Sequence, residues 1–133
     1  MSISINISYG ELLDKLTILR IKAERITDPV KLENVRHELA ELDACWQKAA
    51  AKLDAGVDEQ ITELKSINEQ LWDIEDAIRD REKASLFDDE FIRLARSVYV
   101  TNDRRADVKK QINLTLGSDL VEEKSYSDYS TDD

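Results

Sequence analysis

The residues that make turns and cross-links are scarce in this chain. Its 133 residues include only 3 Gly, 1 Pro and 1 Cys. Sandwiches, barrels and doubly wound sheets need many turns, and turns depend on Gly and Pro, so the composition disfavours these folds. The single cysteine, Cys45, excludes a disulfide within the chain, and we interpret it as a buried structural thiol in a protein of the reducing cytoplasm. The composition therefore favours a single domain of long helices.

Long apolar runs and excess positive charge are also lacking. No apolar run approaches the roughly 20 residues that cross a bilayer, so we expect no membrane insertion. The amino terminus shows no secretory-signal pattern, which again favours the cytoplasm. The net charge of −10 would repel a phosphate backbone, so we expect no nucleic-acid partner. Half of that charge follows Gly117, and we predict a domain of residues 1–126 with a mobile acidic tail, residues 127–133.

The first seven residues alternate with a period of two. Ile3, Ile5 and Ile7 fall on one side of an extended segment, which predicts a short N-terminal strand or extended arm. A strand needs a partner, and the candidates are residues 120–124 of the same chain or a second copy of it. The next residues have the spacing of a capping box, so a first helix with a broad apolar face should run from about 9 to 26.

Two apolar seams with spacings that alternate between 3 and 4 lie on either side of Gly56. If the chain folds back at Gly56, residues whose numbers add to about 113 face each other. Five of the resulting pairs, such as Val35 with Ile78, are apolar on both sides, and the one mismatch is Leu53 facing Gln60 near the turn. The spacing therefore predicts a long antiparallel, coiled-coil-like hairpin over residues 29–83 as the basis of an all-α helical bundle.

A closing helix, over about 88–116, carries polar residues where its apolar stripe should continue. A buried arginine is costly unless an anion or a carboxylate meets it. One interpretation is therefore a pocket for a small anionic, phosphate-bearing ligand. The alternative is a helix break, after which Thr101 or Asn102 caps a new helix and the arginines lie in solvent. The candidate pocket residues are Asn102, Arg104, Arg105, Lys109, Asp14 and Lys15.

Four carboxylates follow one another at spacings of 4, 3 and 4 along the third helix. Like charges at these spacings repel, so a divalent cation such as Mg²⁺ is a candidate partner, as in all-helical nucleotide pyrophosphatases. The alternative is a solvated charged face, which three neighbouring cations favour. We expect no other cofactor. These residues, called the acidic stripe below, are Glu69, Asp73, Asp76 and Asp80.

Two blocks of the sequence resemble a family of small uncharacterised helical proteins, a domain of unknown function found in bacteria and some of their viruses. The blocks are Ile7-Ser8-Tyr9-Gly10-Glu11-Leu12-Leu13-Asp14-Lys15-Leu16-Thr17-Ile18-Leu19 and Thr101-Asn102-Asp103-Arg104-Arg105, the latter continuing through Lys109, Ile112-Asn113 and Gly117-Ser118 to Tyr126. The resemblance brings no established activity. It implies that the family motifs include Gly10, Glu11, Asp14, Lys15, Asn102 and Arg105, and that residues 122–126 are docked.

Three functions of different classes are consistent with these patterns. The sequence favours an interaction or accessory protein that acts by protein binding, and therefore a non-enzyme. The alternatives are a binding module for a small anionic ligand and a metal-dependent nucleotide pyrophosphohydrolase that uses the acidic stripe. We also expect a homodimer, because the seams and the broad first helix offer more apolar surface than four helices bury.

Overall fold

The computed structural model describes residues 1–130, which form four α-helices and no strand. The helices are α1 (Tyr9–Arg25), α2 (Pro29–Ala50), α3 (Asp58–Lys83) and α4 (Asp89–Leu116). The predicted all-α class is confirmed, and the ends of the first and last helices fall within one residue of the predicted positions. Within the described part of the chain, no helix has both the length and the apolar character that crossing a membrane requires.

Side chains and a left-handed glycine end the helices where the sequence predicts. The Ser8 hydroxyl accepts a hydrogen bond from the Glu11 amide at 3.1 Å and caps α1. Asp28 caps α2 by accepting from two amides, and a proline occupies the first turn. Gly117 follows α4 with φ of 65°, a conformation that glycine adopts without strain. These local signals are strong because each satisfies backbone groups that a helix end leaves unpaired.

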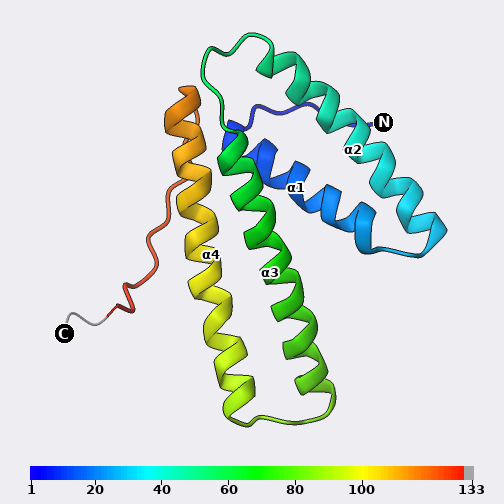
Figure 1. Ribbon diagram of the computed structural model, residues 1–133, viewed down its shortest axis with the longest axis vertical. Helices are drawn as coiled ribbons and strands as arrows, with labels where there is room; N and C mark the ends of the chain where they lie inside the picture. The colour runs from blue at the N-terminus through cyan, green and yellow to red at the C-terminus, as the bar shows by residue number, and fades with distance from the viewer. Residues whose placement is uncertain (131–133) are drawn as a thin grey trace.

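The helices pair in a different way from the predicted hairpin. α1 packs against α2, α3 packs against α4, and α1 also contacts both α3 and α4 (Figure 1). The antiparallel hairpin predicted over residues 29–83 is not observed, because along the described chain α2 and α3 make no close backbone contact and diverge from their connecting loop (Figure 1). The two seams therefore do not meet.

The lengths of the connecting loops explain why the helices pair in this way. Residues 26–28 join α1 to α2 and residues 84–88 join α3 to α4, and such short connections force each pair to lie antiparallel. The longer connection, residues 51–57, lets α2 and α3 separate. Val35 and Trp46 of the first seam are buried, but on a helix that packs against α1. Any two helices with this apolar spacing give apolar facing pairs when one is folded back on the other. Such pairs therefore do not identify which helix packs against α2.

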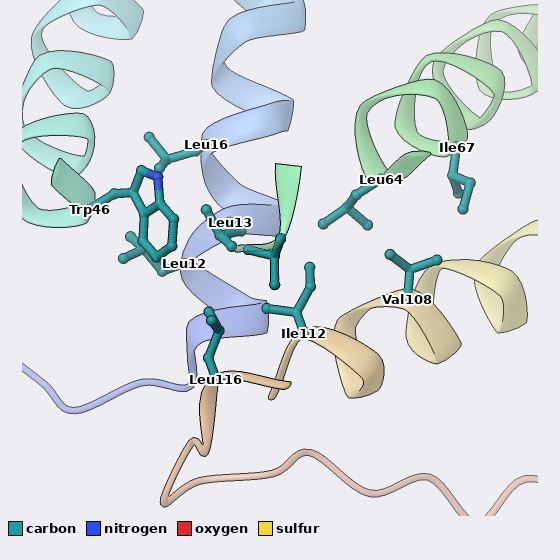
Figure 2. Packing of buried hydrophobic residues seen from close by; sticks show 10 residues of the cluster. Leu12, Leu13, Leu16, Trp46, Leu64, Ile67, Val108, Ile112 and Leu116 are labelled. Carbon is teal, nitrogen blue, oxygen red and sulfur yellow. The ribbon is translucent and has the colours of Figure 1, made fainter. Parts of the chain in front are cut away.

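The central helix of the fold is α1. Leu13 and Leu16 are 0% exposed and Ile21 is 1% exposed, which confirms the predicted broad apolar face. Side chains from all four helices and from the α2–α3 loop meet around α1 (Figure 2). This core consists of Leu12, Leu13, Leu16, Trp46, Val57, Leu64, Ile67, Val108, Ile112 and Leu116.

The N-terminal arm, residues 1–7, is extended but is not a strand. Ile3 is 90% exposed and Ile5 is 73% exposed, and within residues 1–130 no backbone hydrogen bond joins the arm to another segment. Ile7 lines a shallow hollow together with Leu120 and Val121, so the arm and residues 120–124 approach each other at the end of the arm. The predicted pairing with residues 120–124 is thus not observed.

The prediction that Cys45 is a buried thiol is wrong. Its side chain is exposed on α2, next to the buried Trp46. Among the helices of residues 1–130, α1 alone packs against α2, so a narrow stripe of α2 is buried and the neighbouring positions remain in solvent.

Candidate functional site

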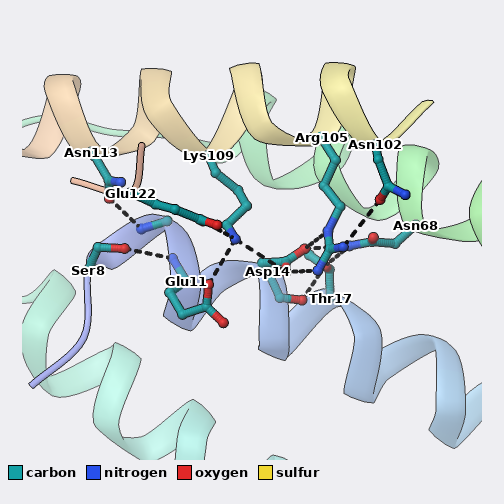
Figure 3. A network of polar contacts seen from close by, with 11 residues as sticks. Ser8, Glu11, Asp14, Thr17, Asn68, Asn102, Arg105, Lys109, Asn113 and Glu122 are labelled. Atoms are coloured by element: carbon teal, nitrogen blue, oxygen red, sulfur yellow. Dashed lines mark hydrogen bonds and ion pairs between the residues drawn. The ribbon is translucent and has the colours of Figure 1, made fainter. Parts of the chain in front are cut away.

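The polar residues of α4 face inward and meet a buried carboxylate of α1 (Figure 3). Asp14 is 1% exposed and lies on the inner face of α1. α4 is one continuous helix, so the alternative of a break near Thr101 or Asn102 with the arginines in solvent is wrong for Arg105. We call the group formed by Glu11, Asp14, Asn68, Arg105, Lys109 and Glu122 the polar cluster.

Arg105 binds Asp14 through two hydrogen bonds. Nε donates to Asp14 Oδ1 at 2.9 Å, and Nη2 donates to Asp14 Oδ2. The third nitrogen, Nη1, has a weak contact with Asn102 Oδ1 at 3.5 Å. The bond to Asp14 raises the pKa of Arg105, and this effect outweighs the opposing effect of burial. A fork of this kind is the geometry in which arginine binds a carboxylate most strongly.

Lys109 is 8% exposed and joins three segments of the chain. Its Nζ donates to Glu11 Oε2 and to Glu122 Oε2, both at 2.8 Å, and lies 3.9 Å from Asp14 Oδ2. Burial would lower the pKa of Lys109, but the hydrogen bonds to Glu11 and Glu122 raise it overall. The ammonium group is thus kept charged by carboxylates of α1 and of the C-terminal segment, residues 118–130.

The ion pair between Lys109 and Glu122 lowers the pKa of Glu122, chiefly through the hydrogen bond that Lys109 donates. A carboxyl group whose pKa is lowered on folding stabilises the folded state at pH values above its unfolded pKa. That stabilisation is lost as the pH falls through the lowered pKa, so acid weakens the hold of Lys109 on Glu122. The Glu122 side chain is 50% exposed, so the contribution of this pair to stability is small.

Two asparagines complete the contacts between the helices. Asn68 of α3 donates from Nδ2 to Asp14 Oδ1 and to Thr17 Oγ1, both at 2.9 Å. Asn113 of α4 accepts from the Gly10 amide at 2.7 Å, and this amide is one of those that a helix start leaves without a partner. Every buried polar side-chain atom within residues 1–130 has a hydrogen-bond partner.

The structure brings four of the six predicted pocket residues together, namely Asp14, Asn102, Arg105 and Lys109. Arg104 is exposed and donates to Gln70 on α3, and Lys15 is exposed on α1. From the sequence, Glu11 is explained by the capping box, and Asn68 and Glu122 are not among the candidate pocket residues. The sequence signal that could have located Asn68 is its position directly after Ile67, a residue of the apolar seam of the third helix.

The two cations of the polar cluster are already neutralised by carboxylates of the chain itself. Two cations, Arg105 and Lys109, meet three carboxylates, those of Asp14, Glu11 and Glu122. An anionic ligand would therefore have to displace one of these carboxylates. Glu122 is the most exposed of the three and lies on a segment without secondary structure, so it is the one that can leave at least cost.

The acidic stripe meets a guanidinium group of the same chain. Nη1 of Arg25, on α1, lies 2.6 Å from Asp73 Oδ1, and its Nη2 lies 3.8 Å from Glu69 Oε2. The same guanidinium lies over the ring of Trp72. Asp76 is exposed farther along α3. Within the described residues, no three His, Cys, Asp or Glu side chains are grouped so that they could hold a metal ion.

The family match spans nearly the whole chain. A family of unknown function (DUF6165) matches residues 3–132, and the chain belongs to this family. No curated protein and no solved structure matches the chain significantly.

Proposed function

We propose that this member of a family of unknown function is a cytoplasmic interaction or accessory protein that acts by protein binding through its N-terminal arm. The exposure of alternate isoleucines on this arm is the observation that supports the proposal most strongly. Ile3 and Ile5 are 90% and 73% exposed on an extended segment. The single Cys45, which has no disulfide partner, suits a reducing compartment.

An extended apolar segment with unpaired backbone groups is a template for a further strand. Within residues 1–130 the arm makes no backbone hydrogen bond, so its amides and carbonyls are free to pair with a strand of a partner. Backbone pairing of this kind gives affinity, and alternate side chains give specificity. The isoleucines would then enter apolar hollows on that partner.

Contacts at the start of α1, beside the polar cluster, support this function by fixing the point where the arm leaves the fold. The arm ends just before Ser8, which caps α1. Two residues later, the Gly10 amide donates a hydrogen bond to Asn113 of α4. Because the charges of the cluster are paired within the chain, we assign it the role of a clamp that joins α1, α4 and the C-terminal segment.

We further propose that the partner of the arm is a second copy of the chain. Two antiparallel arms are self-complementary, as a two-fold interface requires. Apolar residues of both seams, Leu39 and Leu42 on α2 and Leu71 on α3, are only partly buried in one copy. A dimer would bury more of this surface.

Replacing both Ile3 and Ile5 by Asp should convert the dimer to a monomer in light scattering at micromolar concentration. The midpoint of unfolding in a dilute, monomeric sample should stay nearly unchanged, because exposed substitutions alter stability by about 0.5 kcal/mol or less. The matched control is Leu114→Gln, which removes a 67% exposed leucine from α4 and should leave the dimer intact. A wild-type protein that is monomeric at this concentration and retains no partner through its arm contradicts the proposal.

A second candidate function is the binding of a small phosphate-bearing ligand at Lys109. The observation that favours it is a cavity of about 250 Å³ beside the cluster, lined by Glu11, Asn102, Arg105, Lys109, Glu122 and Lys124. Displacement of Glu122 would leave Lys109 and Lys124 facing this space.

Sulfate should raise the melting temperature of the Glu122→Gln variant more than that of the wild type at pH 7. The neutral amide releases Lys109, and a ligand that binds only the folded state stabilises it. Adding Lys124→Ala, which removes an exposed cation from the cavity wall, should reduce the gain. Equal shifts for the wild type and both variants, measured by differential scanning fluorimetry, would dismiss this second function.

A further inference from the structure

The C-terminal segment follows the outer face of α4 and runs antiparallel to it (Figure 1). Its contacts come in two groups. Near the end of α4, Glu122 pairs with Lys109 at 2.8 Å and Glu123 pairs with Lys110 at 3.3 Å. Closer to the start of α4, an aromatic contact holds the part of the segment near residue 129.

That aromatic contact joins Tyr129 to Tyr99 of α4. The ring centroids are 4.9 Å apart in an edge-to-face arrangement. The Asp103 carboxylate lines the same cavity as Tyr129 and raises the pKa of the Tyr129 hydroxyl to about 12. One α4 face thus offers ammonium groups to two adjacent carboxylates and, separately, a ring and a carboxylate to a tyrosine.

The C-terminal segment is held loosely by this face. Within residues 1–130, no backbone hydrogen bond joins residues 119–130 to the helices. Glu123 is 73% exposed and Tyr129 is 50% exposed, and exposed ion pairs contribute little to stability. Two cavities, of about 680 and 340 Å³, remain between the segment and α4. The segment therefore covers this face without filling it.

We propose that this face of α4 is a binding site for an extended acidic peptide of another protein, one that carries two adjacent carboxylates and a tyrosine about six residues later. The chain's own residues 119–130 occupy the site and must be displaced. Charge complementarity to Lys109 and Lys110 selects the acidic pair, and Tyr99 with Asp103 selects the tyrosine. The N-terminal arm meets the covering segment near Ile7 and Val121 but does not line the Lys110 or Tyr99 end of the face, so the proposal extends the proposed function to a second interface.

A fluorescently labelled peptide with the sequence of residues 119–130 tests the proposal with the full-length protein. The variant Glu122→Gln/Glu123→Gln weakens the hold of the covering segment but leaves α4 unchanged. Because a tethered segment competes at an effective concentration in the millimolar range, we expect the variant to bind the peptide at least about tenfold more tightly than the wild type in fluorescence anisotropy.

Two further substitutions in that variant locate the site. Lys110→Glu reverses an exposed charge on the face and should abolish the added affinity, whereas Lys52→Glu, at an exposed lysine after α2, should not. Equal affinity of the wild type and the variant, or no binding by either, would overturn the proposal. A wild-type dimer that the Glu122→Gln/Glu123→Gln variant fails to form would also overturn it, in favour of segments exchanged between two copies.

Discussion

Asp14→Ala should lower the free energy of unfolding by about 3 kcal/mol, since removing one partner of a buried ion pair leaves the other charge uncompensated. Asp14 is 1% exposed and accepts hydrogen bonds from Arg105 and Asn68. The Arg105 side chain is 29% exposed, so water can reach part of the abandoned guanidinium, which places the loss at the lower end of the usual range. Urea unfolding followed by circular dichroism measures the change.

The matched control is Asp73→Ala, the same substitution at another arginine–carboxylate pair. Asp73 lies 2.6 Å from Arg25 but is 69% exposed. An exposed pair contributes about 1 kcal/mol or less, so the control should lose far less stability than Asp14→Ala. Comparable losses at both positions would show that burial of Asp14 does not set the energetics of the site.

A double-mutant cycle with Arg105→Ala separates the pair from its surroundings. Arg105→Ala leaves the Asp14 carboxylate buried with Asn68 and Lys109 as its remaining partners. The loss in the double variant should therefore fall short of the sum of the two single losses by about 1 kcal/mol or more. Strictly additive losses would contradict a direct interaction between the two residues.

The same residues show how far the sequence predicts the site. Polar residues in an apolar stripe of α4 indicated that a buried Arg105 would need an anion or a carboxylate, and Asp14 was among the candidate pocket residues. Glu122 could not be assigned, because it lies on a segment without periodicity and its position depends on where α4 ends relative to α1. A pattern within one helix identifies a buried charge but does not identify a partner from a loop.

Helix ends can be predicted from the nearby sequence, whereas helix pairing cannot. Caps such as Ser8 and Gly117 act on neighbouring backbone groups, so the sequence near each end is sufficient to predict them. The partner of the α2 seam depends on the whole chain. Residues such as Trp46 are buried as the seam predicts, yet they face the core around α1 and not the α3 seam. Apolar spacing determines which side of α2 is covered, and loop length determines what covers it.

Gly10→Ala should destabilise the protein by about 3 kcal/mol, although replacing a helical glycine by alanine is normally stabilising. A Cβ at Gly10 would lie 2.6 Å from the carbonyl oxygen of Lys109 and 3.0 Å from Asn113 Oδ1. The first of these atoms belongs to the α4 backbone, so rotating a side chain cannot relieve the clash. The start of α1 must move away from α4.

That movement would also break contacts of the polar cluster. The Gly10 amide would lose its 2.7 Å bond to Asn113, which leaves a buried amide oxygen without its partner and adds about 1 kcal/mol or more to the loss. Glu11 follows directly, so its ion pair with Lys109 would lengthen as well. Hydrogen exchange at the first turn of α1 should accelerate in the variant, in parallel with a lower urea midpoint.

Gly56→Ala is the control that isolates the close approach. Nothing lies within 4 Å of a Cβ at Gly56, and its φ is not positive. The same substitution should therefore leave the urea midpoint unchanged or raise it, with a gain of about 1 kcal/mol at most, because alanine restricts the unfolded chain. Opposite signs at the two glycines would show that α1 and α4 need Gly10 to meet. A Gly10→Ala protein as stable as Gly56→Ala would mean that the two helices lie farther apart than 2.6 Å implies.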